Sequence, residues 1–287
     1  MFTGKFQRFS PLISHFYCAF KTSSYSDNTK GTLMASIFDS SEFNQNLFFP
    51  RSDGSSGPEA ADEIFVEVDP GCKVHVRRHP SATAKFSLLF FHGNGETVSD
   101  YDELANYFNA LGCELVVCDY RGYGKSEGTP SLRNALKDAS IIYHYLKDRG
   151  KLQKRVCVMG RSLGSAPAIE LCVQFSEISC CVLESGYADP IPLVKRRGLH
   201  IAKITPEENK LFNNSEKIRL VKCPILIMHG EDDFLIVPQE AVLNHQNAGS
   251  KHKELDILEG VGHNDMMMAH DSAYFKSLIK FFNNVFS

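Results

Sequence analysis

The sequence has no long apolar run and no excess of charge of either sign. Its densest apolar stretch, residues 86–91, is far shorter than the roughly 20 residues that a membrane-spanning helix needs. The 287 residues hold 31 basic and 34 acidic side chains, a formal net charge of -3. Such a balance gives no field that would attract a polyanion. We therefore expect no transmembrane segment and no nucleic-acid partner, while peripheral contact with a membrane surface stays open.

Cys-x-x-Cys spacing is also absent, which excludes a zinc ribbon and a dithiol redox motif. The nine cysteines are an odd number for a secreted disulfide framework. Several of them lie in apolar, strand-like runs, among them Cys118, Cys157, Cys180 and Cys181. We predict buried free thiols in a reducing compartment, and therefore a cytoplasmic location.

Residues 1–62 differ in composition from the rest of the chain. They are rich in Ser, Phe, Asn and Gly and lack the apolar periodicity that would bury one face. We interpret them as an N-terminal extension, partly disordered or packed on the surface. The first 26 residues hold three basic side chains, Lys5, Arg8 and Lys21, and no acidic one. Because targeting segments have this bias, organellar import is an alternative to the cytoplasm.

From residue 63 to residue 287, eight short apolar runs alternate with segments of helical spacing. The predicted strands are residues 64–68, 74–77, 86–91, 114–118, 155–159, 180–183, 225–228 and 254–258. The predicted helices are residues 101–111, 132–149, 165–174 and 272–285. This alternation predicts an α/β fold, with a mostly parallel eight-stranded sheet and helices on both faces. The carboxyl ends of the strands then meet at one edge, where ligands usually bind.

The loop after the fifth predicted strand reads Gly-Arg-Ser-Leu-Gly-Ser and leads directly into a helix. Gly-x-Ser-x-Gly between a strand and a helix is the spacing of a nucleophile elbow. Ser162 must occupy a strained turn, and a side chain at Gly160 or Gly164 would collide with neighbouring backbone. A glycine-rich connection without function is the alternative for the pentapeptide alone. The strand-to-helix setting favours a nucleophilic serine.

A serine hydroxyl is a weak nucleophile and needs a base within hydrogen-bond reach. Among the eleven histidines, only His263 combines a glycine-flanked turn, a preceding strand and a following helix. It also follows the acidic run 231–233, so the chain order of serine, acid and histidine is the one this architecture requires. We predict that His263 is the base for Ser162.

The acid that orients the histidine is sought in the run 231–233, directly after the seventh predicted strand. We favour Asp233, three residues after a glycine, over Asp232. Glu184, at the end of the sixth predicted strand, is a further alternative, with a structural hydrogen bond as its other role. The two aspartates have a structural role open to them as well, because either can cap the helix that starts near Pro238.

Acyl transfer also needs backbone donors for an oxyanion. Residues 92–95, His-Gly-Asn-Gly, follow the third predicted strand, so one N–H is expected from Asn94 and the second from Leu163. His92 is expected to be a buried, hydrogen-bonded structural residue. The glycine-rich loop 119–126 lacks both the Walker and the dinucleotide-binding spacing. We predict a tight turn beside the site and no nucleotide cofactor.

Over residues 63–287 the sequence resembles the α/β-hydrolase superfamily. Within it, the motifs look like the branch of small cytosolic hydrolases related to Bem46, which also contains protein depalmitoylases. The matching segments are residues 92–95, 119–126, 160–165, 229–233 and 262–265. The resemblance implies the α/β-hydrolase fold. It carries the family's nucleophile, acid, base and two oxyanion donors onto Ser162, Asp233, His263, Asn94 and Leu163.

The segment that sets substrate choice in this family is here residues 185–223. It is too short for a full lid domain and predicts a small helical cap. Its basic cluster, residues 195–197, is most simply a solvated helix face, and orientation of an acidic or lipid-headgroup substrate is the alternative. The family usually places a proline four residues after the acid, whereas Pro238 is five after Asp233. The loop that carries the acid is therefore expected to be one residue longer than in the family.

The sequence thus favours a serine hydrolase that needs no metal and no other cofactor. It would cleave a carboxylic ester or thioester through an acyl-enzyme, with Ser162 as nucleophile, His263 as base and Asp233 as acid. The expected partner is a small-molecule or acyl-chain substrate, which includes an acylated protein; thioester cleavage rests on the resemblance alone. The alternative is a non-catalytic binding or scaffold protein with the same fold, because such folds host unrelated roles.

Overall fold

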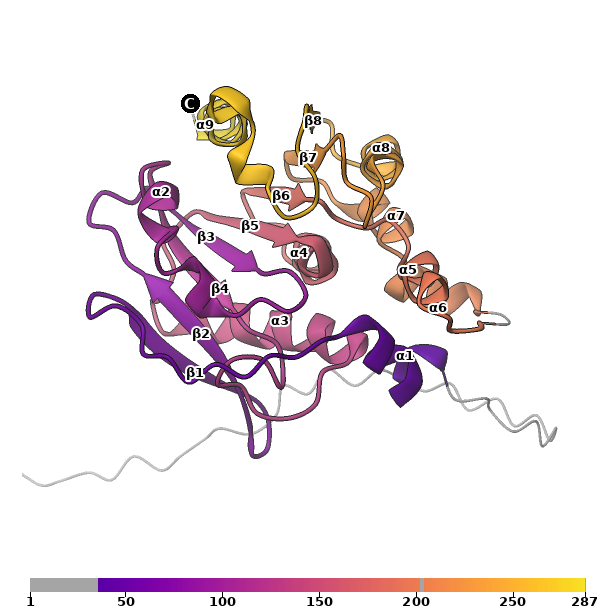
Figure 1. Cartoon of the computed structure of the whole chain (residues 1–287). Coiled ribbons are helices and arrows are strands. Elements are labelled where there is room, and N and C mark those ends of the chain that lie inside the picture. Colours follow the sequence, from indigo (N-terminus) through magenta and orange to yellow (C-terminus); the bar gives the residue numbers. More distant parts are fainter. Residues whose placement is uncertain (1–35, 202–203, 287) are drawn as a thin grey trace, which may run out of the picture. The chain divides into compact units, whose positions relative to one another are not determined.

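The computed structural model describes residues 36–201 and 204–286, which contain one eight-stranded sheet (Figure 1). Its strands are β1 Asp62–Asp69, β2 Cys72–His79, β3 Phe86–Phe91, β4 Cys113–Cys118, β5 Val156–Arg161, β6 Cys180–Glu184, β7 Ile225–Gly230 and β8 Lys253–Leu258. Their spatial order is β1-β2-β4-β3-β5-β6-β7-β8. β2 is antiparallel to β1 and β4, and the other neighbouring strands are parallel. The predicted α/β-hydrolase architecture is confirmed.

Helices cover both faces of this sheet. One face packs against α3 (Leu132–Asp148), α4 (Ser165–Gln174) and α8 (Pro238–Asn247), and the other against α2 (Ala105–Asn109) and α9 (Ala273–Phe286). Alternate residues of β3 are divided between the two apolar cores, as a strand buried on both sides requires. No helix within the described part of the chain is long and apolar enough to cross a bilayer.

Short helices fill the segment between β6 and β7. They are α5 (Pro190–Arg196), α6 (Pro206–Phe212) and α7 (Asn214–Lys217). Each begins at a polar residue whose side chain accepts a backbone N–H of the first turn, namely Asp189, Thr205 and Asn213. These three helices occupy the segment in which the sequence predicts a small cap.

Helix α1 (Ser41–Leu47) packs into the folded unit well before the predicted domain start. The Ser40 hydroxyl caps its first turn, and Phe43 and Leu47 are buried on its inner side. Just before it, the ring of Phe38 stacks on Phe212 of α6 with centroids 4.2 Å apart. Residues 36–48 therefore form part of the core beneath the cap.

This packing corrects the predicted boundary between an extension, residues 1–62, and a domain that starts at residue 63. Residues 36–48 belong to the same compact unit as the sheet. Their few aromatic and aliphatic side chains are too irregularly spaced to show periodicity, and their burial depends on distant residues such as Phe212 of the cap and Tyr120 after β4. The targeting segment expected within the first 26 residues lies outside the described residues.

Cys157 of β5 and Cys180 of β6 form a disulfide. The two residues are register partners on neighbouring parallel strands, with Cα atoms 4.9 Å apart, which is within bonding range. This corrects the prediction of free thiols at both positions, because the pairing depends on a strand register that the sequence does not reveal. Cys118 and Cys181 are free, as predicted.

The burial of α1 can be tested with Phe43→Ala, which removes a fully buried ring. We expect the free energy of unfolding to fall by about 3 to 5 kcal/mol, since a cavity replaces the ring. Phe234→Ala is the matched control, because that ring is 90% exposed and its loss should cost less than about 0.5 kcal/mol. Urea unfolding measures both values. Equal, small losses would contradict a core role for residues 36–48.

Candidate active site

Strand β5 ends directly before Ser162, and α4 begins three residues later. Ser162 has a φ angle of 52°, in the left-handed region that residues with a side chain rarely adopt. A Cβ atom at Gly160 would overlap the backbone of Gly164, and one at Gly164 would overlap the carbonyl of Phe91. The two glycines let β5, α4 and the end of β3 approach closely. The steric requirement predicted for the elbow is confirmed.

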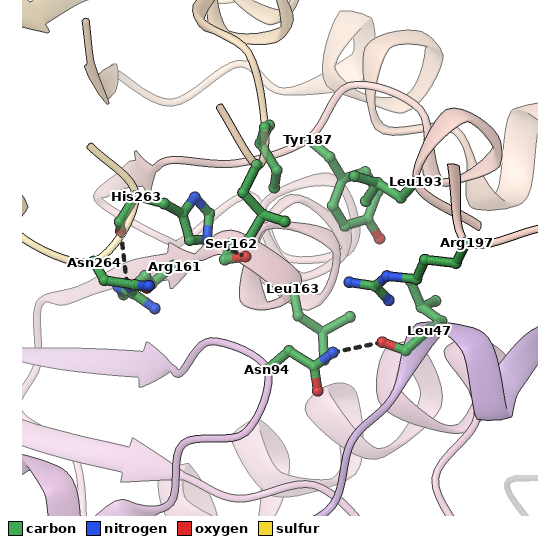
Figure 2. Close-up of a pocket in the computed structure, with 12 residues that line it drawn as sticks. Leu47, Asn94, Arg161, Ser162, Leu163, Tyr187, Leu193, Arg197, His263 and Asn264 are labelled. Atoms are coloured by element: carbon green, nitrogen blue, oxygen red, sulfur yellow. Dashed lines mark hydrogen bonds between the residues drawn. The ribbon is translucent and has the colours of Figure 1, made fainter. Parts of the chain in front are cut away.

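The structure brings Ser162, His263 and Asp233 together from three separate loops. His263 Nε2 lies 3.0 Å from Ser162 Oγ, and His263 Nδ1 lies 2.7 Å from Asp233 Oδ2. Figure 2 shows the imidazole of His263 beside Ser162 at the wall of a pocket. All three residues are less than 10% exposed. One imidazole therefore joins the hydroxyl to a buried carboxylate.

Asp233 is held by donors on both oxygens. Its Oδ1 accepts the backbone N–H groups of Leu235 and Ile236 at 2.9 and 2.8 Å, and His229 Nε2 lies 3.1 Å from Oδ2. Burial acts to raise the pKa of Asp233, but hydrogen bonds from His229 and His263 outweigh it and hold the pKa well below its ordinary value. Asp233 is therefore an ionised acceptor for the imidazole at neutral pH.

The two alternatives for the acid lie elsewhere. Asp232 is exposed to solvent. Glu184 accepts hydrogen bonds from Arg161 Nε at 3.2 Å and from the Tyr274 hydroxyl at 2.8 Å, and burial raises the pKa of its carboxyl. Its role is thus the structural hydrogen bond. The capping role proposed for the aspartates does not occur either, since α8 starts after Val237 without a side-chain cap.

Asn94 and Leu163, the residues expected to stabilise an oxyanion, both line the pocket beside the serine. The Asn94 side chain is fixed from the N-terminal segment: its Oδ1 accepts the N–H of Phe49 at 2.8 Å, and its Nδ2 donates to the carbonyl of Leu47 at 2.7 Å. The Tyr123 hydroxyl also donates to Oδ1. Within residues 36–201 and 204–286, nothing accepts the backbone N–H of Asn94. That N–H is therefore available to a ligand.

Arg161 joins the loops around the site, a role that the sequence reasoning missed. Its guanidinium pairs with Glu96, after β3, and with Glu184, at the end of β6. Nη2 also donates to the backbone carbonyl of His263 at 2.8 Å and to Asn264 Oδ1 at 3.0 Å. The sequence does indicate this role: Arg161 is a charged residue at the end of an apolar strand, and Glu96 and Glu184 lie after β3 and at the end of β6.

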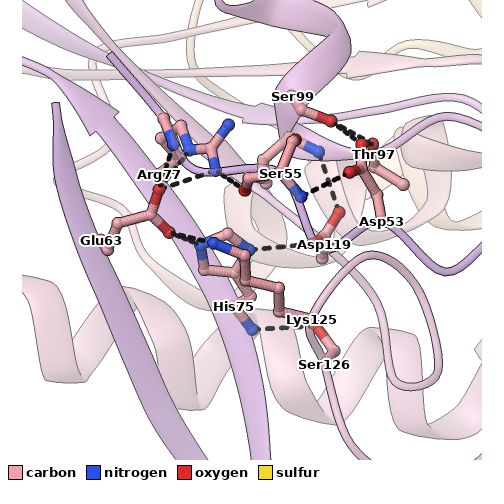
Figure 3. Close-up of polar contacts among 12 residues, drawn as sticks. Asp53, Ser55, Glu63, His75, Arg77, Thr97, Ser99, Asp119, Lys125 and Ser126 are labelled. Carbon is pink, nitrogen blue, oxygen red and sulfur yellow. Dashed lines mark hydrogen bonds and ion pairs between the residues drawn. The ribbon is translucent and has the colours of Figure 1, made fainter. Parts of the chain in front are cut away.

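A second polar network supports the loop after β3, and Figure 3 shows the part of it around His75 and Asp119. His92 Nε2 lies 3.1 Å from Asp119 Oδ1, which also accepts the N–H of Val98 at 3.0 Å. His75 bridges Asp119 to Glu63. Burial acts to raise the pKa of Asp119, but hydrogen bonds from His75 and His92 outweigh it and lower the pKa. His92 is therefore a structural residue, as predicted.

A pocket of about 150 Å³ opens beside Ser162 (Figure 2). Its walls come from the loops after β3, β5, β7 and β8, from the cap and from the end of α1. The lining residues are Leu47, Asn94, Arg161, Ser162, Leu163, Tyr187, Leu193, Arg197, Leu235, Ile236, His263 and Asn264. Among the residues that the structure describes, no group of three His, Cys, Asp or Glu side chains could hold a metal ion.

Known proteins share this fold and sequence pattern. The family model "Serine aminopeptidase, S33" matches residues 82–206. Protein bem46 of Schizosaccharomyces pombe is 30% identical over 208 residues, which cover 70% of this chain and 68% of bem46. The α/β-hydrolase domain-containing protein aho-3 of Caenorhabditis elegans is also 30% identical, over 70% of this chain, and the match spans only 59% of its length. An esterase of Pyrococcus furiosus superposes with a TM-score of 0.69 at 18% identity, covering 83% of this chain and 98% of the esterase.

The role of Arg161 can be tested by Arg161→Leu, which leaves Glu96 and Glu184 without their common counter-charge. We expect the free energy of unfolding to fall by about 3 to 5 kcal/mol, because an uncompensated charge stays buried. Arg219→Leu, at an exposed ion pair, should cost at most about 1 kcal/mol. The double variant Arg161→Leu, Glu184→Leu should regain part of the loss in urea unfolding. Failure to regain any would count against charge pairing as the cause.

Proposed function

The chain belongs to the α/β-hydrolase superfamily, in the branch that contains bem46, and from this membership and its site geometry we propose that it is a serine hydrolase. The bond cleaved is a carboxylic ester or thioester. The observation that carries the proposal is the pair of hydrogen bonds that links Ser162 Oγ through the imidazole of His263 to Asp233. A scaffold protein has no physical need for this alignment or for the strained backbone at Ser162.

In the proposed reaction, His263 Nε2 takes the proton of Ser162 while Oγ attacks the carbonyl carbon. The backbone N–H groups of Asn94 and Leu163 stabilise the negative charge that forms on the carbonyl oxygen. His263 then donates the proton to the departing alcohol or thiol, which leaves an acyl group on Ser162. A water molecule, deprotonated by the same imidazole, releases the acid and restores the serine. Asp233 keeps the imidazole in the tautomer that this exchange requires.

The proposed substrate is a small-molecule ester or an acyl-chain thioester, which includes an acylated protein. The apolar pocket walls, such as Leu47, Leu193 and Ile236, support an acyl group as the part that enters. No step of the mechanism needs a metal or other cofactor. Six of the eight described cysteines are free thiols, as in a reducing compartment, and the Cys157–Cys180 disulfide is the exception to this pattern. From the free thiols we propose the cytoplasm.

A fluorophosphonate probe tests the nucleophile, because it reacts only with a serine that a base activates. We expect the folded protein to become labelled at Ser162, and both Ser162→Ala and the heat-unfolded protein to stay unlabelled. Intact-mass spectrometry and peptide mapping identify the site. Absence of label on folded protein would refute the proposal. Turnover of matched oxyester and thioester substrates would then assign the bond that is cleaved.

The acid is tested by Asp233→Asn, which removes the charge and spoils the imidazole orientation with little change in volume. We expect kcat to fall by about three to four orders of magnitude. Asp232→Asn is the matched control one residue away, and its kcat should stay that of the parent protein. A loss in the control and none in Asp233→Asn would move the acid to Asp232. Steady-state hydrolysis of a short-chain ester measures both.

A further inference from the structure

The pocket beside Ser162 is small. Its volume of about 150 Å³ is that of a cavity that holds one benzene molecule. The catalytic pair Ser162 and His263 lies on one side, and residues of α1 and the cap, among them Leu47, Tyr187 and Arg197, line other walls (Figure 2). A ligand group bound by these walls is therefore only a few bonds from the reacting carbonyl.

Tyr187 carries a buried hydroxyl without a partner. The residue is fully buried, yet its hydroxyl makes no hydrogen bond to any described group. The backbone is fixed on the other side, because the carbonyl of Tyr187 accepts from Asn214 Nδ2 at 3.0 Å and from Asn244 Nδ2 at 3.1 Å. Tyr187 lines the pocket, and Figure 2 shows its side chain directed toward Arg197. A buried donor without an acceptor costs stability.

Arg197 brings a positive charge to the same pocket. Its guanidinium stacks over the Phe49 ring, 4.7 Å from the centroid, and donates through Nη1 to the carbonyl of Asn46. These contacts hold the planar group in place, and toward the described residues they use one of its five N–H donors. Within residues 36–201 and 204–286, no carboxylate forms an ion pair with it. The guanidinium is oriented, and although Arg197 is exposed to solvent, its charge has no ion-pair partner among the described residues.

The charge of Arg197 is not offset by the rest of the pocket. Among the described residues that line the cavity there is no Asp or Glu, and the other cation, Arg161, is already paired with Glu96 and Glu184. Burial, together with the neighbouring Arg196, lowers the pKa of the Arg197 guanidinium from its ordinary value. An anionic ligand group would accept a hydrogen bond from the Tyr187 hydroxyl and would pair with the positive charge of Arg197.

We propose that Tyr187 and Arg197 form a subsite for an anionic oxygen of the substrate, a carboxylate or phosphate carried close to the scissile bond. The substrate class is therefore a short-chain ester or thioester with a negative charge, and this inference rests on the proposed function. The guanidinium binds two oxygens of the anion through parallel N–H donors, and the tyrosine hydroxyl donates to one of them. Ser162 attacks the carbonyl at the other end of the group, with the chemistry unchanged.

Two matched pairs of substrates test the subsite and locate the anion. The first pair consists of glutaryl and 5-methylhexanoyl thioesters of N-acetylcysteamine, in which a terminal carboxylate is replaced by an isopropyl group of the same shape. The second pair consists of butyryl esters of glycerol 3-phosphate and of glycerol. We expect kcat/KM to be at least tenfold higher for the anionic member of one pair, which assigns the anion to the acyl or the alcohol side.

The variants Arg197→Gln and Tyr187→Phe remove one donor group each. Arg197→Gln should reduce the ratio of anionic to neutral kcat/KM by about 10- to 100-fold. Tyr187→Phe should reduce it less, because a neutral donor is lost. Lys195→Gln is the control on the same helix, since Lys195 is exposed and does not line the pocket, and it should keep the ratio of the parent protein. Fluorophosphonate labelling verifies that each variant is folded and active.

The outcomes separate this inference from the proposed function. If the folded protein hydrolyses neither neutral substrate and takes no fluorophosphonate label, the serine-hydrolase proposal fails. If it hydrolyses the neutral substrates but prefers no anionic one, the subsite is refuted. An anionic preference that survives Arg197→Gln unchanged also refutes it. A preference that Arg197→Gln abolishes and Lys195→Gln retains supports the subsite.

Discussion

The buried guanidinium of Arg161 fixes the relative positions of the segments that form the candidate active site. It lies at the end of β5 and contacts the loop after β3, the end of β6 and the loop that carries His263. A forked, planar cation can bind these partners at once, whereas an ammonium cannot present the same geometry. The distance from His263 to Ser162 thus depends on the hydrogen bond from Arg161, the residue before the serine, to the carbonyl of His263. Three segments at the carboxyl edge of the sheet therefore share this one cation.

The features that the sequence reveals are those set by local sterics and by continuous burial. β3 is buried along its whole length, so its apolar run can be recognised in the sequence without knowledge of the neighbouring strands. The elbow can be recognised because the neighbouring backbone leaves no room for a Cβ atom at Gly160 or Gly164, so both positions must be glycine. Asp233 could be favoured over Asp232 from its distance to a glycine, but the bonds that fix it, from Leu235 and Ile236, depend on the fold of the loop.

The features that the sequence conceals depend on contacts between distant residues. The Cys157–Cys180 disulfide follows from the register of β5 and β6. The burial of Phe38 follows from the position of Phe212 in the cap. Arg197 belongs to the basic cluster 195–197, which is exposed to solvent as predicted, but its contact with Phe49 also depends on distant residues. Its stacking on Phe49 requires that the N-terminal segment pass beneath the cap, and no local pattern contains that path.

The path of the N-terminal segment also has a consequence for the order of assembly. The bond from Arg197 to the carbonyl of Asn46 spans 151 residues, and that from Phe49 to Asn94 spans 45. Contacts of such separation carry a large loop-closure entropy and form late. During synthesis, α1 leaves the ribosome before the cap; it can contact earlier partners such as Leu132, but the contacts of its segment with Arg197 and Phe212 form only after the cap has emerged. The pocket wall closes after most of the domain exists, so a nascent or truncated chain has an open, incomplete pocket.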